Sequence, residues 1–297
     1  MFPIAGGYMT VYHRQHARLD ITNATFTDDD LPQLASVFAG PPNLRFSYAF
    51  LRNCTFSNGV AEFLRRIETK YLNMIRCDYP GIIVTGELNF YQCNFETAVA
   101  CVTASPTVPI VTISSVPMSP EEINMVFGVI GPTVVNLRLC ECIFGEGDLA
   151  RIFAAASFPV LEELYLAEYD HGLEEPVVIG LITERTHIPR LKVLAIRYLE
   201  GWDSTYRVLA GAVENRRVPL RVGFYGGPAT DNIRVMFNEA YHRAVAAKEA
   251  RVRSTVAGVA AVLALPSGNV RTDDLAVQLS GLQTATWRVL RFMGKPG

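Results

Sequence analysis

The chain has 297 residues, of which 49% are hydrophobic and 19% are charged. That composition excludes an intrinsically disordered chain and supplies enough apolar side chains for a substantial core. The formal net charge of −2, from 27 basic and 29 acidic residues, argues against a strongly basic nucleic-acid-binding protein.

The N-terminal residues 1–18 are rich in aromatic side chains, and we expect them to form an N-terminal cap. They lack the basic and apolar regions of a secretory signal peptide. Six cysteines are too few for a disulfide-dense scaffold of this length. No apolar run approaches the roughly 18–20 residues that cross a bilayer. We therefore expect a protein of a reducing compartment, cytoplasmic or nuclear, without a membrane span.

From residue 19 onward an octet recurs nine times, with the pattern apolar, any, apolar, any, any, small or Cys, any, often aromatic. Alternating apolar residues indicate a short strand, and the sixth position indicates a bend that turns inward. No single unit can bury its apolar side alone, so we expect neighbouring units to stack. The nine octets begin at Leu19, Ala49, Leu72, Leu88, Val111, Leu137, Leu164, Leu194 and Val222.

The segments between octets carry apolar residues at helical spacing, which predicts a parallel sheet covered by helices. Ser119, Pro120 and Glu122 form a capping-box pattern at the start of one helix. The other expected helices cover 29–38, 58–67, 149–156, 174–183, 204–213 and 231 to about 253. Only 16 residues separate the starts of the Leu72 and Leu88 octets, so one of these units should be degenerate or lack its helix.

Residues 246–297 do not continue the octet. A charged helical stretch over 246–253 precedes an apolar stretch over 256–265, a turn and a final amphipathic helix. We expect this segment to cap the C-terminal end of the repeats or to dock on a neighbouring protein.

Three octets extend to the signature of leucine-rich repeats, L-x-x-L-x-L-x-x-N/C-x-L. The match runs over 134–144, 161–169 and 191–199. The N/C position holds cysteines 54, 77, 93 and 142 in four units, whereas three later units have Tyr169, Leu199 and Gly227 there. Residues 19–245 therefore resemble the leucine-rich repeat family, in particular its ribonuclease-inhibitor-like and F-box-associated types, without the F-box itself. The resemblance implies an α/β solenoid, a curved parallel sheet with helices on its outer side, and a protein-binding role.

In such a strand the second and fourth residues of each octet face outward, onto the concave side of the sheet. Tyrosine and arginine are enriched among the residues that dominate binding energy at interfaces. The candidate partner-binding residues chosen on these grounds are Arg52, Tyr91, Arg138, Tyr165, Arg197 and Tyr225. Each of them could instead be an ordinary solvent-exposed strand residue.

Signals for chemistry are weak in this sequence. Cysteines 54, 77, 93 and 142 occur one per unit, so a ladder of buried thiols accounts for them better than a zinc site. Residues 145–150 fit the G-x-G-x-x-A turn of dinucleotide-binding proteins, but a tight strand-to-helix turn capped by Asp148 is the simpler interpretation. Without a catalytic motif, we expect no catalytic residue, no cofactor and no bound metal.

The sequence thus favours a non-enzymatic scaffold that binds a protein partner on its concave sheet face. Three alternatives stay open: a structural component of a large assembly such as a viral or cellular particle, a substrate-recognition subunit of a ubiquitin ligase, and a nucleotide-dependent enzyme built around 145–150. The mean hydropathy of +0.19 and the low charge fit a chain that neighbours partly cover.

Overall fold

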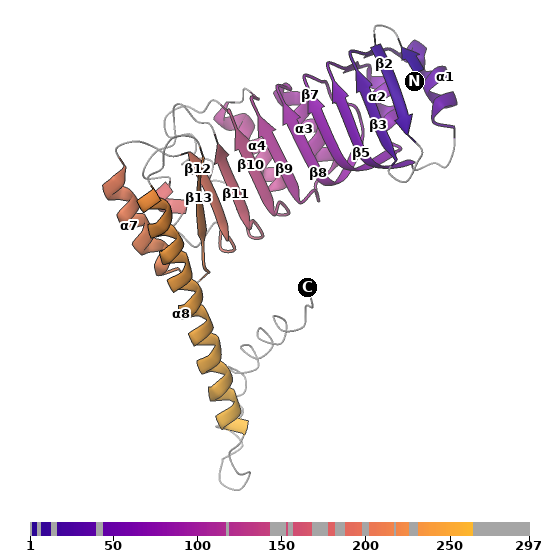
Figure 1. Ribbon diagram of the computed structural model, residues 1–297. Coiled ribbons are helices and arrows are strands. Elements are labelled where there is room, and N and C mark those ends of the chain that lie inside the picture. The colour runs from indigo at the N-terminus through magenta and orange to yellow at the C-terminus, as the bar shows by residue number, and fades with distance from the viewer. Residues whose placement is uncertain are drawn as a thin grey trace. The chain divides into compact units, whose positions relative to one another are not determined.

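The computed structural model describes residues 2–4, 7–12, 17–39, 44–116, 119–142, 153, 157–167, 178–181, 188–197, 202–216, 218–225 and 231–263. The chain divides into two compact units, Met1–Tyr241 and His242–Gly297, and the larger unit is built on one extensive sheet (Figure 1). Its eleven strands lie in the order β1 (Phe2–Ile4), β2 (Gly7–Tyr12), β3 (Arg18–Thr22), β5 (Leu44–Arg52), β7 (Ile67–Ile75), β8 (Ile83–Tyr91), β9 (Ile110–Ser114), β10 (Asn136–Cys140), β11 (Glu163–Ala167), β12 (Val193–Arg197) and β13 (Arg221–Tyr225).

Every neighbouring pair from β3 to β13 runs parallel, whereas β1–β2 and β2–β3 run antiparallel. The expected α/β class with a large, mostly parallel sheet is therefore confirmed. Strands β1 and β2 fall within the expected N-terminal cap, and the sequence pattern did not indicate them. The short strands β4 (Thr25–Phe26) and β6 (Thr55–Phe56) pair separately, and the rings of Phe26 and Phe56 stack 5.3 Å apart.

The nine octets lie side by side in register, as stacked units require. Leu19 pairs with Ala49 and Ile21 with Leu51, and each later strand continues these two rows. Both rows point into the core, because alternate side chains of a strand share one face. The predicted inward turn at the sixth position is also confirmed, since all of its described residues are buried: Ala24, Cys54, Cys77, Cys93, Val116 and Cys142.

Helices cover one face of this sheet, and Figure 1 shows α2, α3 and α4 behind the strands. The described helices are α1 (Leu31–Val37), α2 (Asn58–Leu64), α3 (Phe95–Ala104), α4 (Pro120–Ile130), α7 (Asp203–Glu214) and α8 (Asp231–Leu263). The expected capping box of α4 is present: the Ser119 hydroxyl accepts from the Glu122 amide, and the Glu122 carboxylate accepts from the Ser119 amide over 2.6 Å. Helix α3 was missed, although Asn94 caps it by accepting from the Thr97 amide.

Two expected helices fall largely outside the described residues. Of 149–156 only Phe153 is described, and of 174–183 only 178–181, and these described residues are helical. Helix α8 is longer than expected, since it continues to Leu263 through part of the apolar stretch 256–265. No helix among the described residues combines the length and the apolar character needed to cross a membrane.

The unit between β7 and β8 has no helix, as the 16-residue spacing suggested. Residues 76–82 connect the two strands without forming a helix, and Ile82 is fully buried. Gly81 adopts a φ of 80° against α2, where a Cβ atom would lie 1.8 Å from the Ala61 carbonyl oxygen. The connection therefore packs tightly on α2, while the layer of helices lacks one member between α2 and α3.

Candidate functional site

The sheet face opposite α2, α3 and α4 is called the open face here, and three rows of side chains run across it. The register of the strands defines each row. The first row contains Arg18, Tyr48, Tyr71, Glu87, Ile110, Asn136, Glu163, Val193 and Arg221. The second contains Asp20, Phe50, Asn73, Asn89, Thr112, Arg138, Tyr165, Ala195 and Gly223. The third contains Thr22, Arg52, Ile75, Tyr91, Ser114 and Cys140, and the backbones of residues 167, 197 and 225 continue it.

The four candidate residues whose side chains are described belong to these rows, but they do not form one cluster. Arg138 and Tyr165 are direct partners in the second row, on β10 and β11. Arg52 and Tyr91 lie in the third row, with Ile75 of β7 between them. The backbones of residues 197 and 225 pair at the far end of that row, and their side chains lie outside the described part of the structure.

Arg138 and Tyr165 belong to a closed network of four side chains. The Arg138 guanidinium carbon lies 5.1 Å from the centroid of the Tyr165 ring, which is a cation–π distance. Arg138 Nε donates to Asn136 Oδ1 over 3.2 Å, and Asn136 Nδ2 donates to Glu163 Oε2 over 2.6 Å. The Tyr165 hydroxyl donates to the same carboxylate oxygen over 3.1 Å. We call these four residues the Arg138 network.

The contacts of the Arg138 network hold the Arg138 guanidinium and the Tyr165 phenol in place. Asn136 is only 7% exposed and supports both the guanidinium and the carboxylate. A side chain that is already ordered loses less conformational entropy on binding. Asn136 and Glu163 were not predicted as site residues, because each precedes its octet by one residue. Their spacing of two residues from Arg138 and Tyr165 would have indicated a shared face.

The N-terminal half of the open face has similar contacts. The Arg18 guanidinium lies 5.1 Å from the Tyr48 ring centroid and forms a 2.7 Å ion pair with Asp20. On β7, Lys70 Nζ lies 5.1 Å from the ring centroid of its neighbour Tyr71. Aromatic rings and cations therefore occur together on β3 and β5, on β7, and on β10 and β11.

A polar ladder follows the strands at the edge of the sheet, at the fifth position of six octets. All six residues are non-glycine and adopt a left-handed backbone with φ between 51° and 53°. Three side-chain hydrogen bonds link successive turns: Asn53 to Asn23 over 2.7 Å, Arg76 to Gln92 over 2.7 Å, and Ser115 to Glu141. This turn ladder consists of Asn23, Asn53, Arg76, Gln92, Ser115 and Glu141.

The four cysteines at the sixth octet position form the expected ladder of buried thiols. They are free thiols at most 4% exposed, and each sulfur contacts a backbone carbonyl, such as Cys77 Sγ to Ile75 O at 3.2 Å. Burial raises the pKa of Cys93 and raises that of Cys142 to about 12, so both stay protonated at neutral pH. The described residues contain no cluster of three or more His, Cys, Asp or Glu side chains suited to a metal ion. The glycine turn 145–150 lies outside them.

No model of a protein family matches the sequence, and no curated protein matches it either.

Proposed function

We propose that the chain is a non-enzymatic scaffold that holds a protein partner on the open face of its sheet, in the manner of a leucine-rich-repeat-like solenoid. The Arg138 network carries this proposal, because it fixes an arginine and a tyrosine on that face, opposite α2, α3 and α4. Arginine and tyrosine supply much of the binding energy at protein interfaces.

Two further observations support a protein partner. Tyr91 is 37% exposed, and Arg52 is also exposed in the same row. The chain's net charge of −2 disfavours the phosphate backbone of nucleic acids as the main ligand. We propose that the protein resides in the cytoplasm or the nucleus, since six cysteines in 297 residues do not make a disulfide-dense scaffold.

The test begins with the tagged full chain, which captures partners from native extract for identification by mass spectrometry. Affinity for the identified partner is then measured by calorimetry for the wild type and for Arg138→Ala combined with Tyr165→Ala. We expect a loss of about tenfold or more, the scale of a hot-spot residue. The matched control, Arg207→Ala with Val208→Ala, removes a guanidinium and an apolar side chain from exposed positions of α7.

The control variant should bind like the wild type, and circular dichroism should show both variants folded. Unchanged affinity of the Arg138/Tyr165 variant for a partner that forms a stable complex would overturn the proposal.

A structural role in a large assembly is the second candidate, and α8 favours it. Residues 251–258 of this helix are all exposed, with Val252 and Val256 at 44% and 46%. Replacing both valines by aspartate should then dissociate oligomers of the full chain in analytical ultracentrifugation, whereas a wild-type monomer at all concentrations would contradict self-assembly. The described residues add no support for the ubiquitin-ligase or nucleotide-enzyme alternatives.

A further inference from the structure

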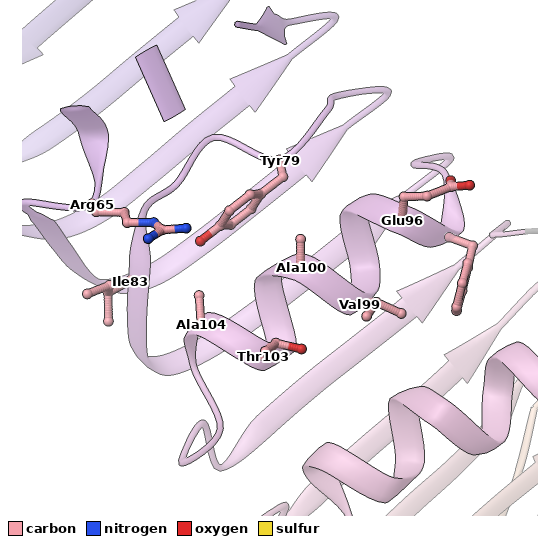
Figure 2. Close-up of a pocket in the computed structure, with 9 residues that line it drawn as sticks. Arg65, Tyr79, Ile83, Glu96, Val99, Ala100, Thr103 and Ala104 are labelled. Atoms are coloured by element: carbon pink, nitrogen blue, oxygen red, sulfur yellow. The ribbon is translucent and has the colours of Figure 1, made fainter. Parts of the chain in front are cut away.

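The missing helix between β7 and β8 leaves a groove on the helical side of the sheet. It has a volume of about 660 Å³, within the range of protein binding sites. One wall is α3, which contributes Ala100 and Ala104, and the other is formed by Arg65 at the end of α2 and Tyr79 of the helix-free connection (Figure 2). Ile83 also lines the groove and is 38% exposed.

Apolar groups line most of the groove, and charges stand at its ends. Arg65 lies at the end near Ala104, with the Tyr79 hydroxyl pointing toward it, and Glu96 lies at the other end, in the first turn of α3 (Figure 2). Glu96 makes no ion pair within the described part of the chain. Arg65 pairs with Glu62 at 2.9 Å, but both side chains are more than half exposed, so the pair competes weakly with a new partner.

The walls of the groove are fixed by the fold. Gly81 holds the connection against α2, and Pro80 and Ile82 beside it are buried. Burial raises the pKa of Tyr79, which keeps its phenol protonated and able to donate a hydrogen bond. The opposite wall offers the small side chains of Ala100 and Ala104, one helical turn apart, so another backbone can approach α3 closely.

We propose that this groove binds an amphipathic helix of a partner protein, which takes the place of the missing helix. A helix is the element that fills this layer elsewhere, since α3 packs against α4 and α1 against α2. The charges define its polarity: an acidic end faces Arg65 and Tyr79, and a basic end faces Glu96. Acidic residues favour helix N-termini and basic residues C-termini, so the bound helix runs antiparallel to α3.

This site is on the opposite side of the sheet from the Arg138 network and is independent of the proposed function. The probe is a fluorescein-labelled synthetic peptide of about 18 residues, long enough for an isolated helix. It carries one Leu/Ala stripe, Glu in its first turn and Lys in its last turn. Its charge-reversed counterpart exchanges the Glu and Lys positions. Fluorescence anisotropy measures the affinity of both peptides for the full-length chain.

We expect the first peptide to bind about tenfold more tightly than its charge-reversed counterpart, as complementary charges at an interface would produce. Arg65→Glu combined with Glu96→Lys should reverse this preference. Ala100→Trp should abolish binding by filling the groove, whereas Met125→Trp on the exposed side of α4 should not. Arg138→Ala with Tyr165→Ala should bind the peptide like the wild type, which separates this site from the open face.

Three results would overturn the proposal: no binding of either peptide at its solubility limit, binding that survives Ala100→Trp, or a preference that the charge exchange leaves unchanged. Binding of dodecanoate without binding of either peptide would assign the groove to small amphiphiles and would also overturn it.

Discussion

Asn53 and Asn23 occupy the same position of two successive repeat units, and the side-chain amide of Asn53 donates a 2.7 Å hydrogen bond to the side-chain oxygen of Asn23. Both residues adopt the left-handed backbone conformation. Asparagine tolerates this conformation better than other residues with a Cβ atom. The two Asn-x-Thr sequons in the chain, at Asn23 and Asn53, therefore follow from the geometry of the turn.

Asn53→Ala should lower the free energy of unfolding by about 1–2 kcal/mol, because alanine pays the left-handed penalty and loses the hydrogen bond. Asn53→Gly loses the same hydrogen bond without that penalty, so its loss should be smaller. Urea unfolding of the three proteins measures the difference. Equal losses would show that the backbone conformation is not what the asparagine supplies.

Gly81→Ala should destabilise the chain by at least about 2 kcal/mol, since it combines a positive φ with a clash against backbone. The clash is with the Ala61 carbonyl oxygen, 1.8 Å from the added Cβ. The matched control is Gly128→Ala in α4, where an added Cβ meets nothing within 4 Å. The Gly128→Ala variant should have a free energy of unfolding about 0.5–1 kcal/mol higher than the wild type, because alanine has the higher helix propensity. Thermal unfolding in which both variants shift in the same direction would contradict the structure.

Cys142→Ala should flatten the loss of stability at alkaline pH. Burial raises the pKa of Cys142 to about 12, whereas an unfolded thiol titrates near about 8.5. Above the pKa of the unfolded thiol, the folded state binds more protons than the unfolded state. The free energy of unfolding therefore falls as the pH rises toward the pKa of the folded state, by up to about 1.4 kcal/mol per pH unit. Urea unfolding with a reductant present, between about pH 9 and 11, tests this, and curves with the same pH slope for variant and wild type would contradict it.

Arg138 and Tyr165 should be coupled in the isolated protein. A double-mutant cycle with alanine at each position should give a coupling free energy of about 0.5–1 kcal/mol, the scale of an exposed cation–π pair. Guanidinium-chloride unfolding, at an ionic strength equal in all four proteins, provides the values. Additive effects would mean that the two side chains do not order one another before a partner binds.

The alternation of apolar residues predicted the octet part of each strand from β3 to β13 and the stacking of neighbouring units. Strands β5, β7 and β8 begin five residues before their octets, at Leu44, Ile67 and Ile83, which the octet did not indicate. A one-residue slip would move Leu19 and Ile21 to the solvent side, so burial specifies the pairing strongly. The β1–β2 hairpin carried no comparable signal, since its residues do not follow the octet. Helix α3 was not predicted, because the octet pattern does not extend into the segment between two octets. Asn94, a residue type that favours the N-cap position, could have indicated where this helix begins.

The contacts between the site residues could be predicted less completely than the strands, because they depend on which strands are neighbours. Arg138 and Tyr165 could be assigned to one face from the strand period, but their mutual contact depends on which strands are neighbours. Asn136 could not be recognised as a supporting residue without knowing that Glu163 pairs beside it. The groove beside Arg65 could not be predicted from the sequence. It lies where the short unit between β7 and β8 lacks the helix that other units have.

Because each strand of the main sheet bonds only to its immediate neighbours in that sheet, the described sheet contains no single mechanical clamp. Tension applied between its ends would peel off one strand at a time. The force–extension trace should then show a series of small steps, each releasing a single repeat of the chain, in place of one large rupture.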